Sequence, residues 1–410
     1  MADAASVRPT RGRWYVLLMI SAMYLITYLD RVNISTAAPL ISKEYGFDKI
    51  TMGFIFSAFV WAYALFQVPG GWLSDKLGAR GVLTSIVTYW SIMTAATAGA
   101  FPGATRAMQL WYPQPERGFV QGITHSASRL GAAIAPPLVV LIMSQWGWRA
   151  VFLICGAVGI LWSLWWALSY RNLPEEHGMV NRGELEQIRG VDAAGAIKPP
   201  PMEKQTKVPW GALIRSPNMW AVMCAYFTYA YCLWIFLSWL PSYLMDFRHF
   251  TLLKVGLFAS LPLWAGVIGD TVGGLATDYL LKRTGSAKIG RRVVAITGLL
   301  GCAVFIVPAA LTEDAYVAVY CLTASLFFLE CTIGPSWAVP MDTGGKYSGT
   351  VSGMMNMAGN FGGAISPIVF GVLVQIGDWQ APFIVAAVLL VIGSAIWAFW
   401  LDPDRHILTG

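Results

Sequence analysis

Residues 118–137 read GFVQGITHSASRLGAAIAPP, and residues 349–368 read GTVSGMMNMAGNFGGAISPI. Both stretches are apolar and rich in glycine, and four residues of the first recur in the second. Gly118, Gly122, Gly131 and Pro136 match Gly349, Gly353, Gly362 and Pro367 at a constant offset of 231. A repeat over so large a distance predicts two homologous halves in one chain.

The repeat continues upstream with a different spacing. GGWLSD at residues 70–75 matches GGLATD at residues 273–278, but at an offset of 203. Between the two matches the first half is therefore 28 residues shorter than the second. A longer loop in the second half accounts for about eight of them, and the remaining ~20 correspond to one membrane crossing. We expect the fourth helix to be mostly missing near residues 100–101, either as a shortened segment buried in protein or as a deletion in the gene.

The composition excludes a soluble protein. Of 410 residues, 56% are hydrophobic and 12% are charged, whereas soluble domains carry ~25% charged residues. The apolar residues gather in runs that are each long enough for a helix crossing ~30 Å of hydrocarbon. These runs are 14–40, 51–74, 82–112, 118–142, 147–170, 217–243, 255–280, 293–312, 315–341, 347–376 and 380–401.

Lysine and arginine predict the orientation. With both termini in the cytoplasm, 20 of the 28 Lys and Arg residues fall on the cytoplasmic side, which is the positive-inside pattern. The net charge of +6 therefore reflects topology, and no nucleic-acid partner is expected. We predict an N-terminal transmembrane bundle, a cytoplasmic central loop, a C-terminal transmembrane bundle and a cytoplasmic tail, with bounds 1–170, 171–216, 217–401 and 402–410.

The loop at residues 71–80 reads GWLSDKLGAR. Gly71 lets neighbouring helices approach, Gly78 permits a tight turn, and Asp75 can pair with Arg80. The loop resembles the motif between helices 2 and 3 of the major facilitator superfamily, where it latches the inner gate, and Asp278 belongs to a partial second copy. The resemblance implies an all-α membrane protein of two pseudo-symmetric six-helix bundles, here with the fourth helix truncated. The alternative is a basic loop that only anchors the topology.

A narrower resemblance covers nearly the whole chain. YLDRVNIS at residues 28–35, WAYAL at 61–65 and QVPGG at 67–71 resemble the anion:cation symporter family. That family includes bacterial hexuronate, glucarate and galactonate permeases and the sialin-type carriers. The resemblance implies proton symport of an organic anion, with a sugar acid as the expected substrate, across the bacterial cytoplasmic (inner) membrane by alternating access.

Asp30 and Arg31 are the first candidate site residues. Charged side chains within a membrane run are costly and are usually functional. Arg31 offers a planar fork of donors that can grip a carboxylate, and Asp30 can exchange a proton. In the resembling family the arginine at this place contacts the substrate and the aspartate takes part in proton coupling. The alternative is an ion pair near the outer mouth of the first helix.

Further substrate contacts are expected from polar side chains at mid-membrane depth: Tyr63, Ser128, Arg129, Asn356 and Asn360. Asn356 and Asn360 share one helix face by their i, i+4 spacing, and buried amides need hydrogen-bond partners, which a hydroxylated acid would supply. Packing between helices, or an ion pair in the case of Arg129, is the alternative for each. Glu330 is a second candidate for proton coupling. The aromatic residues Tyr231, Trp239 and Tyr243 are either an outer gate or packing.

Other classes of function find no support in the sequence. A phosphate-binding P-loop is absent, which disfavours ATP-driven transport. The four histidines and six cysteines lack metal-ligand spacing, so neither a cofactor nor a metal is expected, and enzymatic motifs are lacking. A monomer is expected, with the lipid bilayer, protons and a small organic anion as partners. Because the resembling family carries coupling residues on the missing fourth helix, a transport-dead or substrate-sensing protein of the same fold is the alternative.

Overall fold

The computed structural model describes residues 8–58, 60–61, 104, 107–108, 110–113, 116–191, 196–199, 209–344 and 347–407. Nine of the helices in this part of the chain are long and apolar enough to cross a membrane. They confirm the predicted runs from residue 14, from 118 onward through 170, and from 217 to 401. The predicted runs 51–74 and 82–112, and the expected truncation at 100–101, lie largely outside the described residues.

The first helices are α1 (Gly12–Tyr45), α4 (Arg117–Trp146) and α5 (Trp148–Ser169), and the central loop contains η3 (Pro174–Glu176), α6 (Arg182–Arg189) and α7 (Trp210–Arg215). The later helices are α8 (Pro217–Ser238), α9 (Leu240–Ser242), η4 (Tyr243–Phe247), α10 (Leu252–Thr284), α11 (Ala287–Leu311), α12 (Ala315–Cys331), α13 (Ile333–Gly344), α14 (Ser348–Gln375), α15 (Ala381–Ala395) and η6 (Ile396–Trp400). Several of these helices are longer than the apolar runs predicted for them, because the backbone hydrogen bonds continue beyond the last apolar residue.

The chain forms two compact units. Unit 1 consists of Met1–Tyr28, Leu65–Gly131 and Phe152–Thr206, and unit 2 of Leu29–Ala64, Ala132–Val151 and Lys207–Gly410. The division falls inside α1 and inside α4. Unit 2 therefore contains segments from both sequence halves.

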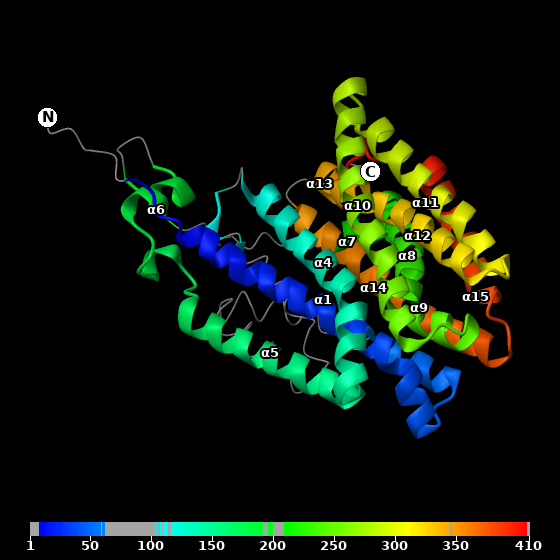
Figure 1. The fold of residues 1–410 in the computed structure, drawn as a ribbon. Helices are drawn as coiled ribbons and strands as arrows, with labels where there is room; N and C mark the ends of the chain where they lie inside the picture. The colour runs from blue at the N-terminus through cyan, green and yellow to red at the C-terminus, as the bar shows by residue number, and fades with distance from the viewer. Residues whose placement is uncertain are drawn as a thin grey trace, which may run out of the picture. The chain divides into compact units, whose positions relative to one another are not determined.

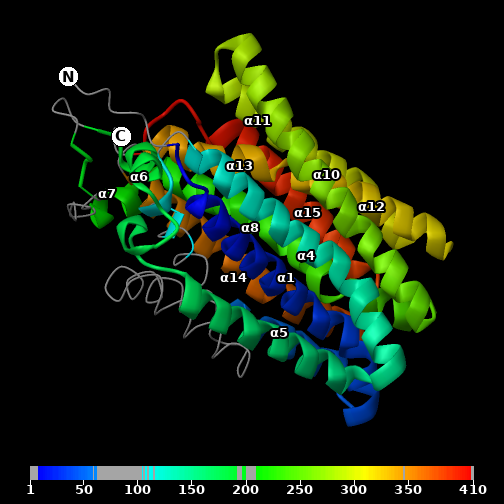
Figure 2. The ribbon, with the colours of Figure 1, turned by 60° about the vertical axis from the view of Figure 1, so that its left-hand side comes forward.

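In unit 1, α4 and α5 pack on either side of α1 (Figure 1, Figure 2). Gly131 of α4 lies so close to α1 that a Cβ there would stand 2.2 Å from the Leu25 carbonyl oxygen, and only glycine permits this approach. On the other side, the Trp162 indole N–H donates to the carbonyl of Met19 across 2.9 Å. Trp162 stacks on Trp166, because side chains four residues apart on α5 lie next to each other on one face of the helix.

The central loop caps the start of α1. The carboxylate of Glu184 on α6 is fully buried and accepts hydrogen bonds from the backbone N–H groups of Gly12 (3.0 Å) and Arg13 (2.8 Å). It also accepts one from the Thr10 hydroxyl (2.6 Å). The first N–H groups of a helix have no partner within the helix, so a negative side chain at this place satisfies them and complements the helix dipole.

In unit 2 the most extensive packing joins α8 to α14, α10 to α12, and α11 to α12 and α15. Pro241 follows the end of α8, where a short α9 and a π-helical turn, η4, replace a straight continuation. Residues 401–407 fold back over one end of this bundle. The Asn218 side chain accepts from the Asp402 N–H (2.9 Å) and donates to the carbonyls of Asp402 (2.9 Å) and Arg405 (3.0 Å).

Candidate functional site

Asp30 and Arg31 lie within the membrane-length helix α1, and both are half-buried. The Asn33 amide donates a long hydrogen bond of 3.4 Å to the Asp30 carboxylate. Nearby hydroxyls are satisfied by their own helix, since Thr36 donates to the Val32 carbonyl across 3.0 Å. The structure thus places a carboxylate and a guanidinium at consecutive positions of a helix otherwise free of charge from Trp14 to Ser42.

Ser128 and Arg129 lie on α4 in unit 1. The Ser128 hydroxyl donates to the His125 carbonyl of the preceding turn across 2.6 Å, so its proton is used inside the helix and only its lone pairs are left for a ligand. Arg129 is half-buried, one turn after His125. The His125 ring meets the buried Tyr24 ring of α1 edge to face at 6.0 Å.

Glu330 is 2% exposed near the end of α12. Its carboxylate accepts a hydrogen bond of 3.1 Å from the Tyr229 hydroxyl on α8. Tyr229 stacks on Tyr226, with ring centroids 5.3 Å apart, and the Tyr226 hydroxyl accepts from the Trp337 indole N–H across 3.1 Å. Tyr226, Tyr229 and Trp337 are not among the site residues predicted from the sequence. The sequence signals of this aromatic cluster are the i, i+3 spacing of the tyrosines and the i, i+7 spacing of Glu330 and Trp337.

Asn356 and Asn360 lie on α14, where Asn356 is half-buried and Asn360 is 7% exposed. The neighbouring Gly359 faces the Tyr226 ring, since a Cβ there would stand 2.6 Å from it. The helix that carries the two amides therefore packs directly on the aromatic cluster around Glu330. Both features belong to unit 2.

Asp278 belongs to a charged cluster at the end of α10. Arg291, at the start of α11, donates to the Asp278 carboxylate (3.2 Å) and to the Asp342 carboxylate of α13 (3.1 Å). The Arg291 side chain is 8% exposed in these pairs, so one guanidinium holds three helices together. Of the remaining predicted site residues, Tyr63 and the gate-motif residues Gly71, Asp75, Gly78 and Arg80 lie outside the described part of the chain.

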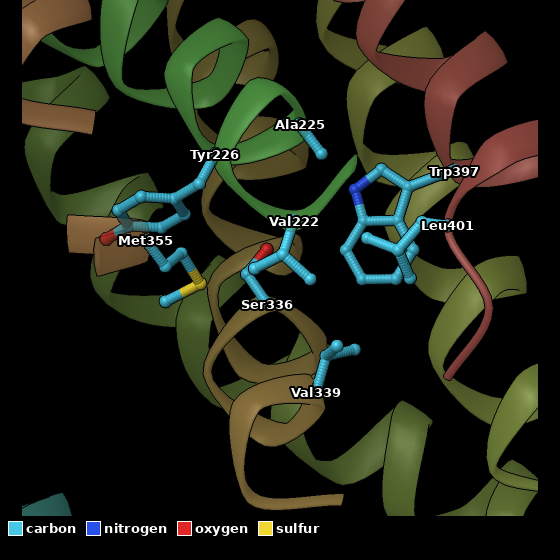
Figure 3. A pocket seen from close by; sticks show the side chains of 8 residues that line it. All are labelled: Val222, Ala225, Tyr226, Ser336, Val339, Met355, Trp397 and Leu401. Atoms are coloured by element: carbon cyan, nitrogen blue, oxygen red, sulfur yellow. The ribbon is translucent and has the colours of Figure 1, made fainter. Parts of the chain in front are cut away.

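A small pocket in unit 2 has an empty volume of about 170 Å³ (Figure 3). It is lined by Val222, Ala225, Tyr226, Ser336, Val339, Met355, Trp397 and Leu401. This volume includes open solvent, so the enclosed space is far below the ~300–1,000 Å³ of usual ligand pockets, and the lining offers no cation to an anion. The Ser336 hydroxyl is already used by the Thr332 carbonyl at 2.7 Å. The pocket is a packing gap beside the aromatic cluster rather than an anion site.

Known proteins resemble the chain along its length. It is 42% identical to the probable sulfoacetate transporter SauU of Cupriavidus necator over 416 positions, which cover 96% of this chain and 94% of the relative. It is 31% identical to the D-galactonate transporter of Escherichia coli, with 98% of each chain covered. It is 32% identical to the probable galactarate/D-glucarate transporter GudP of the same species, with 90% and 89% covered. The 416 positions exceed the 410 residues of this chain, so the first relative has residues where this chain has none.

Solved structures have the same fold. A bacterial homolog of the human lysosomal transporter Spinster, in an inward-facing and occupied conformation, superposes with a TM-score of 0.75 at 16% identity, covering 96% of this chain and 98% of that one. A D-xylose-proton symporter gives a TM-score of 0.73 at 12% identity, with the same coverage.

The family model of the Major Facilitator Superfamily matches residues 20–367 and 344–408. The match covers nearly all of the chain and agrees with the relatives of more than 30% identity, which are named as transporters and not as enzymes. Together with the membrane-length helices, this shows that the chain is a multi-pass integral membrane protein that belongs to the Major Facilitator Superfamily and resembles its sugar-acid permeases.

Proposed function

We propose that the protein imports an organic acid anion together with protons by alternating access, with a sugar acid of the hexuronate, glucarate or galactonate type as substrate. The observation that carries the proposal is the charged pair Asp30–Arg31 inside a membrane-spanning helix, in a chain whose relatives are named as carriers of galactonate, galactarate or glucarate. The bundle of residues 1–170 would rock against the bundle of residues 217–401 around a midplane site.

In this proposal Arg31 and Arg129 bind acid groups, because a guanidinium can hold a carboxylate through two parallel hydrogen bonds. Asn356, Asn360, Ser128 and Tyr63 contact hydroxyls of the substrate. Asp30 and Glu330 carry protons. The buried position of Glu330 in the membrane-length helix Ala315–Gly344 supports its role, since ionisable side chains within such a segment are costly and are usually functional.

Sulfoacetate is a second candidate substrate. It is favoured by the 42% identity to a probable sulfoacetate transporter and by the two intramembrane arginines, which supply one positive charge for each acid group of such a dianion. The carboxylate-binding chemistry is the same in both cases. The difference lies in the hydroxyl contacts, which sulfoacetate does not use.

The test is uptake of labelled sulfoacetate, galactonate, glucarate and glucuronate into proteoliposomes, with and without a proton gradient that is acidic outside. Accumulation of one of these anions that requires the gradient, and that a protonophore abolishes, is the expected result. Uptake at the same rate with and without the proton gradient would contradict the proposed proton coupling. Binding without any uptake would identify the transport-dead or substrate-sensing alternative.

We further propose that the protein resides in a bacterial cytoplasmic membrane with both termini inside, on the strength of the lysine and arginine distribution. A green fluorescent protein fused after the tail folds and fluoresces in the cytoplasm. A dark, exported fusion protein of full length would contradict this orientation.

A further inference from the structure

A first-half helix lies against a second-half helix at one end of unit 2. The helix Lys49–Ala58 follows α1 and packs along α14 through small residues at i, i+4 spacing. A Cβ on Gly53 would stand 2.6 Å from the Pro367 carbonyl oxygen, and the Ser57 hydroxyl donates to the Ala364 carbonyl across 2.6 Å. In Figure 1 this blue helix lies at the end of the bundle where α9 is found.

Lys49 begins this helix and makes four contacts with the second half. Its ammonium pairs with the Asp246 carboxylate of η4 at 2.5 Å and lies 5.5 Å from the centre of the Trp379 ring. Its backbone N–H donates to the Gln375 side chain at 2.9 Å. Its carbonyl oxygen would stand 2.4 Å from a Cβ on Gly371.

An aromatic layer lies deeper along the same helices. Trp239, which follows α8, is 1% exposed and meets the Phe56 ring edge to face at 5.3 Å. Its indole N–H donates to the Pro367 carbonyl across 3.1 Å. Trp239 thus joins the first-half helix and α14, while Tyr243 bonds the carbonyl of Ala309 within the second half.

We propose that Lys49, Asp246, Gln375 and Trp379 form a latch, here named the Lys49 latch, which closes this end of the transporter and separates in every transport cycle. The proposal rests on the alternating-access part of the proposed function and on no particular substrate. Alternating access requires the two halves to part at each end in turn. The latch is a polar contact between the two sequence halves, and the contact between Trp239 and Phe56 lies next to it along the same helices.

The exposure of the latch suits a contact that breaks and reforms. The Lys49 and Asp246 side chains are 27% and 28% exposed, so water can solvate both charges when they separate. A partly exposed pair of this kind is worth little in net terms, whereas breaking a fully buried pair strands a charge in the apolar interior. The ion pair therefore favours the closed arrangement, but its small free energy does not prevent the two halves from separating.

Unit 2 also contains an ion pair that can serve as a control. Arg149 at the start of α5 pairs with Glu44 at the end of α1 at 2.5 Å. Both residues belong to the first sequence half, so this pair has no reason to break when the halves separate. Its side chains are 58% and 42% exposed.

The first experiment measures opening directly and needs no substrate. Ser57→Cys places a thiol at a position that is 1% exposed beneath the latch, and its labelling by a charged maleimide is followed on the purified full-length protein, with the native chain as background. Adding Lys49→Ala is expected to raise the labelling rate by about fivefold, the factor that the upper value for a partly exposed ion pair gives. The charge swap of Lys49→Asp with Asp246→Lys should bring the rate back down.

Adding Arg149→Ala to Ser57→Cys should leave the labelling rate unchanged. An unchanged rate with Lys49→Ala, or an equal rise with Lys49→Ala and Arg149→Ala, would overturn the latch. Neither result depends on which anion is carried, so a failed substrate assignment remains distinguishable.

A second experiment locks the contact. Lys49→Cys with Asp246→Cys, joined by a short bifunctional thiol reagent, should abolish uptake of the transported anion into proteoliposomes. Glu44→Cys with Arg149→Cys, joined by the same reagent, should leave uptake near that of the untreated variant. Full uptake by the cross-linked Lys49→Cys/Asp246→Cys protein would overturn the proposal.

Discussion

The Tyr229 hydroxyl donates a hydrogen bond of 3.1 Å to the Glu330 carboxylate and so joins α8 to α12 inside unit 2. Both side chains are buried, Tyr229 at 1% and Glu330 at 2% exposure. Tyr229 in turn stacks on Tyr226, whose ring lies against Gly359 next to Asn360. The helix that carries the candidate substrate amides thus packs against the cluster that contains the candidate proton carrier.

Replacing Tyr229 by Phe should lower the stability of the detergent-solubilised protein by ~1–3 kcal/mol, because it removes a hydrogen-bond donor from a buried carboxylate. The measurement is thermal unfolding, and the matched control is Tyr231→Phe. Tyr231 is also buried, and its hydroxyl makes no hydrogen bond among the described residues. Equal unfolding midpoints for the two variants would show that the Tyr229–Glu330 bond contributes nothing.

Replacing Arg31 by Ala should reduce uptake of the transported anion by more than about tenfold, since a charge-assisted hydrogen bond contributes ~1.5–3 kcal/mol. Arg31→Lys keeps the positive charge but loses the planar fork, so it should recover only part of the uptake. Proteoliposome uptake at matched protein content measures both. Near-normal uptake by Arg31→Ala would refute the role given to this side chain.

Replacing Glu184 by Ala should loosen the start of α1, because three donors then lose their acceptor. We expect a local cost of ~1–3 kcal/mol, and a smaller one for Glu184→Gln, which keeps an oxygen acceptor without the charge. Hydrogen exchange of the first turns of α1 measures it. Glu186→Gln on the same helix is the control, because its pair with Arg182 is largely exposed and such pairs contribute little. An equal effect of both substitutions would contradict the cap.

The packing of the central loop should depend on pH through His177. Its ring is 8% exposed and meets the Trp111 ring edge to face, while its Nδ1 accepts the Met179 N–H at 3.2 Å. Burial lowers the pKa of His177 below its usual 6.5; a hydrogen bond to the Ser169 backbone opposes this shift, and the positive charge of Arg171 adds to it. The unfolded loop therefore binds the proton more readily, so this contribution to stability is present above pH 6.5 and is lost as the pH falls through the folded pKa.

Hydrogen exchange of residues 172–190, corrected for the intrinsic effect of pH, should therefore accelerate as the solution is taken from about pH 7.5 to about pH 5.5, across the usual histidine range. His177→Gln keeps a polar side chain that does not titrate, and its exchange should lose this acid-induced component. The same acceleration in both proteins would assign the effect to other groups.

Replacing Asn218 by Ala should release the tail, because this one side chain makes three hydrogen bonds with residues 402–405. Trypsin cleavage after Arg405 should become about tenfold faster, the factor that corresponds to ~1.4 kcal/mol and lies within the cost of leaving buried groups unsatisfied. Mass spectrometry detects the loss of the last five residues. Lys288→Ala, which removes a more exposed pair with Asp402, should have a smaller effect.

The sequence alone was sufficient for the class of protein and for most of the helices. Apolar length and the distribution of lysine and arginine are properties of single segments, so the runs beginning at residues 118, 147 and 217 could be predicted without knowing their neighbours. The repeat between residues 118–137 and 349–368 indicated two homologous halves in the same way, and the motif at residues 71–80 pointed to the superfamily. The role of each candidate site residue stays a prediction.

Only the tertiary structure decided which distant residues meet. Lys49 and Asp246 are 197 positions apart, Gly12 and Glu184 are 172 apart, and Tyr229 and Glu330 are 101 apart. Helical periodicity tells which residues share a face, but not which helix that face will contact. Between membrane helices the hydrophobic effect gives no direction, because lipid is as apolar as the packed side chains. Register is set instead by close approaches at glycines such as Gly131 and Gly53 and by the few hydrogen bonds that form once the backbones touch.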